Sequence, residues 1–253
     1  MHPKVQEAFD TLTRTLLGRS LGPIGPYEAW LRQNTRPDIL SKSPISGRTV
    51  YSPPLSFYYH ILSTALKEDE AAPLGARHLS EADALSINLS NAKKLTRSLA
   101  FHTPEWVIGQ NEAVDECGIY GFSSFCSKGS SFVHSKYSGY SFWPRNSEYL
   151  FGVNVVFHSK FCLKCYNSVN LTRCFEVSHS SNSSDCYFCY NVDACSECLF
   201  CTNAKSLRYA IFNHSYPKEE YLRVKKLVLA EISAKLQKDQ KLDLNVFNVG
   251  CPK

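Results

Sequence analysis

A period of three residues dominates the middle of the chain, between Val114 and Ala210. Every third residue of this stretch, counted from Val114, is uncharged, and nearly all of these residues are small or apolar. Ten of the eleven cysteines in the chain lie in this one phase. Neither the 3.6-residue period of an α-helix nor the two-residue alternation of a half-buried strand accounts for the pattern. Repetition at a fixed short period indicates instead a solenoid, in which each coil stacks on the one before.

A longer period of twelve residues is superimposed on the period of three. One twelve-residue series consists of Cys126, Ser138, Leu150, Cys162, Cys174, Cys186, Cys198 and Ala210. A doubled period also occurs, because the tripeptide His134-Ser135-Lys136 recurs 24 residues later. Stacked β-coils bring equivalent residues together at the strand spacing of about 4.8 Å. We therefore predict a mainly β protein built on a parallel β-solenoid, with coils of 12 residues favoured over coils of 24.

Asparagine follows the same twelve-residue spacing outside the small-residue phase. The two series are Asn146, Asn170 and Asn182, and Asn167, Asn191 and Asn203. Asparagine tolerates the left-handed backbone conformation that a tight corner requires. These positions are therefore expected to be corners of the coil.

The absence of cysteine before Cys117 divides the chain into three expected parts. Residues 1–113 are expected to be helical or mixed, with one helix near the N-terminus and others beginning near Pro54 and Ser80. This region either covers the first coil or serves as a docking arm for a neighbouring subunit. The solenoid is expected over 114–210. Residues 211–253 are expected to contain a helix of about 20 residues that starts close to Pro217 and caps the open end of the solenoid.

Charge and hydropathy exclude several classes of protein. The net charge of +5 comes from 28 basic and 23 acidic residues, a balance that does not predict nucleic-acid binding. No uncharged apolar run approaches the roughly 18 residues of a transmembrane helix, so no membrane partner is expected. The first seven residues lack the apolar core of a signal peptide, which predicts a protein that is not secreted and that keeps its thiols reduced in the cytoplasm.

The cysteine spacing also matches metal half-sites. The matching residues are Cys162, Cys165, Cys186, Cys189, Cys195, Cys198 and Cys201, which form three groups with two-residue gaps. Such spacing is typical of zinc and iron–sulfur ligands. The period of three explains the same spacing without a metal, and buried cysteine packs as a small apolar residue. Buried free thiols and no cofactor are the favoured interpretation, with a zinc or iron–sulfur site and disulfides between coils as alternatives.

The second half of the solenoid resembles a family of proteins. The similar segments are Asp185-Cys186-Tyr187-Phe188-Cys189, the cysteine run from Cys195 to Cys201, Leu207-Arg208-Tyr209-x-Ile211-Phe212-Asn213, and Lys218-Glu219-Glu220-Tyr221. They resemble uncharacterised cysteine-rich repeat proteins of archaea, of candidate-phylum bacteria and of their tailed viruses. The resemblance covers residues 161–226 and implies a β-solenoid-like structural component, with a virion as one setting. It implies no activity and no catalytic residue.

An enzymatic function is not expected. The sequence contains no nucleophile elbow, phosphate-binding glycine loop or paired carboxylate motif. Left-handed solenoids include hexapeptide acyltransferases that use a histidine, and His134, His158 and His179 lie outside the inward phase. The aliphatic residue at every sixth position that is typical of those enzymes is absent. An acyltransferase-like enzyme is therefore the third hypothesis, and neither a catalytic residue nor a small-molecule substrate is predicted.

The outward phases contain many aromatic residues that a narrow core lined by serine and cysteine cannot hold. Flanking segments or partner subunits must cover them. We expect four of them to form one open patch that another protein chain buries: Tyr137, Tyr140, Trp143 and Tyr149. The sequence therefore favours a non-enzymatic structural or protein-interaction component of a virion or similar assembly, and a metal-binding or redox module is the alternative.

Overall fold

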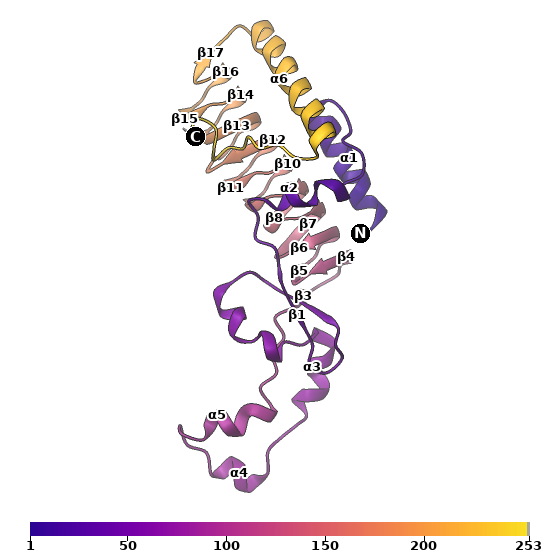
Figure 1. Cartoon of the computed structure of the whole chain (residues 1–253). Coiled ribbons are helices and arrows are strands. Elements are labelled where there is room, and N and C mark those ends of the chain that lie inside the picture. The colour runs from indigo at the N-terminus through magenta and orange to yellow at the C-terminus, as the bar shows by residue number, and fades with distance from the viewer. Residues whose placement is uncertain (252–253) are drawn as a thin grey trace.

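The computed structural model describes residues 1–251 and contains a parallel β-solenoid with flanking helices (Figure 1). Successive coils pair twelve residues apart, so that Cys162 lies opposite Cys174 and Cys186 lies opposite Cys198. The predicted fold class and the twelve-residue coil are confirmed, and the 24-residue coil is excluded. The solenoid is longer than the predicted 114–210, because its strands run from β3 (Trp106–Ile108) to β17 (His214–Ser215).

The remaining strands of the solenoid are short segments separated by corners. They are β4 (Glu112–Cys117), β5 (Ile119–Gly121), β6 (Ser124–Gly129), β7 (Phe132–Gly139), β8 (Phe142–Phe151), β9 (Asn154–Phe157), β10 (Lys160–Leu163), β11 (Tyr166–Val169), β12 (Thr172–Ser178), β13 (Ser184–Asp193), β14 (Ser196–Leu199), β15 (Thr202–Lys205) and β16 (Arg208–Ile211). All solenoid pairs are parallel except β16 with β17, where the chain turns back and ends the stack.

The three-residue period arises from a left-handed backbone conformation that recurs at every third residue. Tyr137, Tyr140, Trp143 and Asn146 are consecutive examples, with φ between 49° and 57°. Each such residue forms a corner, so twelve residues complete one four-sided coil. All six asparagines predicted as corners adopt this conformation, which confirms that prediction. Aromatic and charged residues occupy most of the other corners, so asparagine marks only a minority of them.

Serine and cysteine point into the coil because their side chains are small and also form hydrogen bonds there. Ser159 Oγ donates to the carbonyl of Phe157 at 2.8 Å and accepts the backbone N–H of Leu171, one coil further on, at 2.9 Å. Cys174 Sγ donates in the same way to backbone carbonyls. Buried backbone groups need such partners. The inward phase therefore supplies both the apolar core and part of its hydrogen bonding.

Two long helices cover one side of the solenoid. Both α1 (Pro3–Leu17) and α6 (Lys218–Asp239) pack against a ladder formed by Phe151, Leu163, Phe175, Tyr187 and Leu199. The predicted helices at the two ends of the chain are thus present. The predicted role of the C-terminal helix is wrong, however, because α6 runs back along the side toward α1 and does not lie across the open end (Figure 1).

Segments from both ends of the chain cover a second side. These are η1 (Gly25–Tyr27), α2 (Glu28–Arg32), the antiparallel hairpin of β1 (Ile39–Lys42) and β2 (Thr49–Ser52), and residues 241–251. The Asn34 side chain donates to the Tyr166 hydroxyl at 3.4 Å, and the Phe247 ring packs on the Tyr166 ring with centroids 5.0 Å apart. The other two sides of the solenoid carry exposed corners and remain uncovered by these segments.

Residues 56–104 project from the first-coil end of the solenoid (Figure 1). They form η2 (Ser56–His60), η3 (Leu62–Thr64), α3 (Glu68–Gly75), α4 (Glu81–Leu85), α5 (Ala92–Leu95) and η4 (Thr96–Ser98). Ser80 caps α4 by accepting the N–H of Asp83 at 3.1 Å, as its sequence predicts. Near Pro54 the chain forms the short 3₁₀ segments η2 and η3 in place of the expected helix, and the helix expected near Ser80 is present but short, since α4 ends at Leu85. No helix within residues 1–251 is long and apolar enough to cross a membrane.

Candidate functional site

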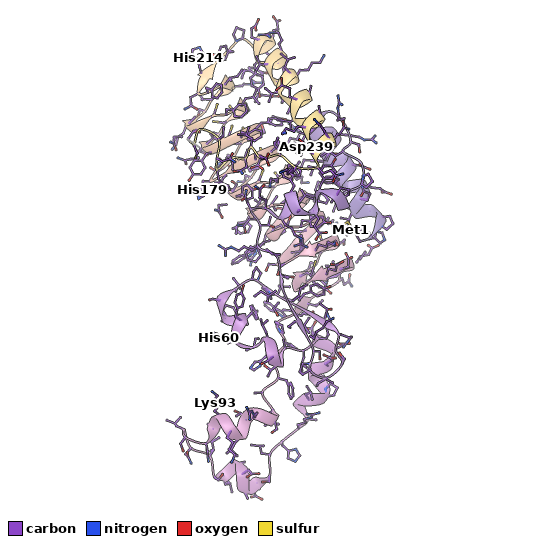
Figure 2. The ribbon with its side chains drawn as sticks, viewed as in Figure 1. Met1, His60, Lys93, His179, His214 and Asp239 are labelled. Atoms are coloured by element: carbon purple, nitrogen blue, oxygen red, sulfur yellow. The ribbon has the colours of Figure 1, made fainter. Side chains whose placement is uncertain are left out.

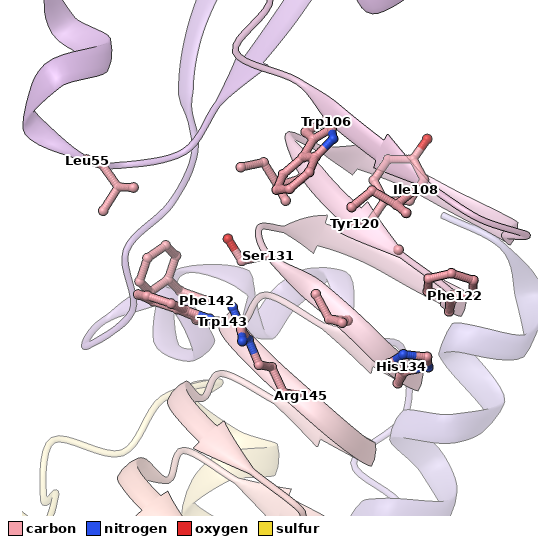
Figure 3. Close-up of a pocket in the computed structure, with 13 residues that line it drawn as sticks. Leu55, Trp106, Ile108, Tyr120, Phe122, Ser131, His134, Phe142, Trp143 and Arg145 are labelled. Atoms are coloured by element: carbon pink, nitrogen blue, oxygen red, sulfur yellow. The ribbon is translucent and has the colours of Figure 1, made fainter.

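A hollow of about 230 Å³ lies on an uncovered side of the solenoid, close to its N-terminal end (Figure 3). We call it the aromatic groove. Its lining residues are Leu55, Trp106, Ile108, Ile119, Tyr120, Gly121, Phe122, Ser131, Val133, His134, Phe142, Trp143 and Arg145. They come from β3, β5, β7, β8 and the segments between these strands, except Leu55, which lies between β2 and η2. Three successive coils and the strand that precedes them therefore build the site.

The twelve-residue register determines the shape of the aromatic groove. Gly121 pairs with Val133, and Val133 pairs with Arg145, so these three residues form one ladder along the solenoid. The side chains of this ladder lengthen from glycine to valine to arginine. A Cβ atom at Gly121 would lie 3.2 Å from Ile108 Cβ, which leaves little room for a side chain there. Gly121 and Val133 therefore form the floor of the groove.

Aromatic rings line both edges of this floor, as Figure 3 shows. At one corner the rings of Phe122 and His134 stack with centroids 4.8 Å apart and an angle of 5°. At the other corner the Trp143 ring packs edge-on against Phe142 and has the guanidinium of Arg145 5.2 Å above it. Rings held by their neighbours in this way keep a defined orientation.

The upper part of the groove exposes large apolar side chains to solvent. Trp106 is 59% exposed and Phe122 is 47% exposed. The indole nitrogen of Trp143 is buried and has no hydrogen-bond partner in residues 1–251. Arg145 and His134 are exposed, and none of the described lining residues is acidic. The groove thus combines apolar surface with an unpaired hydrogen-bond donor and positive charge.

The structure does not bring the four residues of the predicted patch together. Tyr137 and Tyr149 stack on each other at 5.2 Å and pack beside α1. Tyr140 is only 1% exposed, and its hydroxyl donates to Glu28 of α2 at 3.3 Å. Trp143 alone lies in the aromatic groove. The expected single open patch is wrong because residues three apart occupy successive corners of the coil, and only residues twelve apart share a side.

Sequence analysis missed Trp106 and did not single out Phe122. Trp106 pairs with Ile119, a spacing of thirteen residues, whereas the coils that follow are spaced by twelve. This additional residue shifts Trp106 out of the repeat, so the periodicity does not reach it. The remaining signal in the sequence was a tryptophan just before the repeat. The periodicity does not predict which side of the solenoid such a residue faces.

Ten cysteines lie buried in the solenoid core as free thiols, and Cys251 is exposed. Burial raises the pKa of the Cys126 thiol to about 12 and the pKa of Cys165 well above its usual range. Hydrogen bonds from the thiols of Cys189 and Cys198 lower the pKa of Cys201. Within residues 1–251, no three His, Cys, Asp or Glu side chains are grouped in a way that could hold a metal ion. The cysteines proposed as alternative ligands form ladders along the solenoid axis.

The three histidines considered for catalysis lie at exposed corners. His134 belongs to the aromatic groove, and His158 lies two coils further along the same corner. His179 lies at the neighbouring corner, where its Nδ1 is 2.8 Å from Ser178 Oγ. No family model matches the chain, and no curated protein shows significant similarity to it.

Proposed function

We propose that this protein is a non-enzymatic interaction component of a larger protein assembly, and that the aromatic groove binds a segment of another protein chain. The observation that carries the proposal is the pair of exposed rings, Trp106 and Phe122, beside an apolar hollow. Aromatic side chains are enriched at protein interfaces, where central ones contribute about 2 kcal/mol or more each.

The solenoid supports this role by holding the groove rigid before a partner binds. The groove is built from strands that are hydrogen-bonded across successive coils, and its corner rings stack on one another. Binding to a rigid surface loses less conformational entropy than binding to a mobile one. The second uncovered side of the solenoid is polar, with residues such as Lys136 and Lys160 exposed.

Size and charge favour a protein segment over other ligands. The volume of about 230 Å³ is smaller than the roughly 300–1,000 Å³ of typical small-molecule sites. Arg145 is the one arginine or lysine that lines the groove, which is too little positive charge for a nucleic-acid surface, because such surfaces bind mainly through many phosphate contacts. The resemblance of residues 161–226 to cysteine-rich repeat proteins of archaea, of candidate-phylum bacteria and of their tailed viruses is the support for a virion as one such assembly.

Selection from a random peptide library tests the proposal. The full chain is immobilised, and selected peptides are measured against wild type and against a Trp106→Ser/Phe122→Ser variant. We expect peptides that bind wild type and lose at least about 30-fold in affinity on the variant. Phe212→Ser is the matched control, since Phe212 is 72% exposed at the opposite end of the solenoid. Failure to select any groove-dependent peptide would show that the groove is not a protein-binding site.

A further inference from the structure

Residues 67–101, which we call the arm, leave the body of the protein and return to it at one point. The backbone N–H of Leu66 donates to the carbonyl of His102 at 2.8 Å, and the N–H of His102 donates to Thr64 at 3.0 Å. Between these residues the arm extends away from the coils, with Lys93 near its far end (Figure 2). The arm is therefore anchored at its root, where Arg48 of the body also pairs with Asp69 and Glu70, and its far part from α4 to α5 extends away from the body.

The arm presents apolar side chains that no other described part of the chain covers. Leu85 is 80% exposed, Ile87 is 55% exposed and Leu89 is 99% exposed. None of the residues in α3, α4 and α5 is buried. Helices as short as α4 and α5 are far below the roughly 12–15 residues at which an isolated helix becomes marginally stable in water. An additional surface is needed to stabilise this segment.

The charges of residues 81–89, the acidic segment of the arm, complement those of the aromatic groove, while basic residues such as Arg77, Lys93 and Lys94 flank this segment. Glu81 and Asp83 stand in the first turn of α4, just before the exposed apolar residues. Neither carboxylate forms an ion pair within residues 1–251, and Arg145 in the groove also forms none. An acidic and apolar segment thus matches a groove that is apolar and carries positive charge. Such complementarity guides both the choice of partner and the rate of encounter.

We propose that the aromatic groove of one copy binds residues 81–89 of a second copy, so that two chains exchange arms in a symmetric dimer. This inference rests on the proposed function of the groove as a protein-binding site. The arm extends away from β3, β5, β7 and β8, the strands that carry the groove of the same chain (Figure 1). In the proposed dimer, a two-fold axis near the arm roots brings each arm to the partner's groove. A two-fold interface uses every contact twice, which makes such an exchange favourable.

Sedimentation equilibrium of the full chain over a range of concentrations tests the inference. Wild type is expected to have twice the mass of the 28.6 kDa chain. Leu85→Ser/Leu89→Ser removes the arm contact and Trp106→Ser/Phe122→Ser removes the groove contact, and each is expected to raise the dimer dissociation constant at least about 30-fold. Phe212→Ser and Leu40→Ser are controls, because both residues are exposed outside the arm and the groove and both variants should remain dimeric.

Mixing and charge reversal separate arm exchange from any other mode of dimerisation. The arm variant and the groove variant, each monomeric alone, should form a weak heterodimer, since together they retain one intact arm and one intact groove. Arg145→Glu should weaken the dimer, and Glu81→Lys in the same chain should restore part of the affinity. A dimer that persists in the groove variant, or a pair of variants that does not form a heterodimer, would overturn the arm exchange.

The outcomes also distinguish this inference from the proposed function. A synthetic peptide of residues 78–91 is measured on the full-length arm variant alongside the library-selected peptides. In one outcome, library peptides bind in a groove-dependent way, wild type is monomeric and the 78–91 peptide does not bind. This outcome would refute the second copy as occupant and leave the proposed function standing. Absence of binding by every peptide, with a monomeric wild type, would refute both.

Discussion

Serine and cysteine side chains both form hydrogen bonds with backbone groups inside the solenoid, where they occupy twelve-residue ladders. Ser147 Oγ accepts the backbone N–H of Ser159 at 3.1 Å, and Cys201 Sγ accepts that of Asn213 at 3.4 Å. Alanine or valine at these positions fills the core but provides no acceptor. A net hydrogen bond contributes about 1 kcal/mol, and an unsatisfied buried group costs about 1–3 kcal/mol. The ladder positions therefore favour small side chains that also accept a hydrogen bond.

Cys174 Sγ donates to the carbonyls of Thr172 and Ser183, so substitutions at Cys174 test the hydrogen-bonding role of these ladder positions. We expect Cys174→Ser to change the free energy of unfolding little, and Cys174→Ala to lower it by about 1–2 kcal/mol. Cys174→Asp should abolish folding, because an unpaired charge in a core with no exposed surface costs several kcal/mol. Urea unfolding followed by circular dichroism measures all three. A soluble and stable aspartate variant would contradict the inward orientation of this ladder.

At the scale of elements, a buried ion pair joins three segments that are distant in sequence. Lys164 and Glu176 occupy one corner of adjacent coils, 3.7 Å apart, and neither side chain is exposed. Lys164 Nζ donates to the carbonyl of Trp30 in α2 at 2.8 Å, and Glu176 accepts the N–H of Val246 in the C-terminal tail at 3.1 Å. The pair therefore attaches both α2 and the tail to the solenoid.

The stability of this junction should depend on pH. Burial raises the pKa of Glu176 from 4.5 to about 7, and burial lowers the pKa of Lys164. The folded state thus holds the Glu176 proton more tightly than the unfolded state does. The contribution of Glu176 is fully present below pH 4.5 and is lost as the pH rises to about 7, a change of up to about 3 kcal/mol.

Urea unfolding at several pH values measures this effect against a Lys164→Met/Glu176→Gln variant, which lacks both charges. Wild type should lose stability relative to the variant between pH 4.5 and pH 7. Glu148→Gln is a control for carboxylate removal, because Glu148 lies beside Lys160 on the surface and an exposed pair contributes about 0–1 kcal/mol. An unchanged difference across this pH range would mean that folding does not raise the pKa of Glu176.

At the scale of the whole molecule, buried cysteines lie along most of the solenoid core. The reactivity of their thiols therefore measures whether the stacked coils remain folded. We expect Cys251 to react at once with a disulfide reagent, since it is exposed, and the ten core cysteines to react only as the protein unfolds. Access limits Cys201 as well, although its pKa is lowered, because its sulfur lies inside the coil. Counting modified cysteines against time by mass spectrometry tests this expectation.

Metal analysis of the purified chain completes that experiment. We predict less than one zinc or iron per chain, because the period of three already explains the cysteine spacing. Stoichiometric metal, lost together with secondary structure when a chelator is added, would favour the alternative of a metal-binding module. Ladder cysteines such as Cys186 and Cys198 would then be ligands and would be protected from the reagent until the metal is removed.

The sequence alone determined the repeating part of this protein, because the repeat is a local property of the chain. The phase of Cys162 and Cys174 predicted which residues face inward, the asparagines predicted corners, and apolar spacing predicted α1 and α6. Each of these features depends on residues within about one coil of each other. The same local information did not show that one coil has four sides, so residues three apart were wrongly placed on one surface.

Only the tertiary structure decided which sides are covered and where a groove remains. Tyr140 is buried because α2 packs on it from more than a hundred residues away, and Lys164 is buried beneath Trp30. Trp106 lines the groove although an additional residue takes it out of the repeat. These placements depend on which distant segment forms the most favourable contacts with each side. From β4 to β16 the twelve-residue period is the same on all four sides, so it does not distinguish a covered side from an open one.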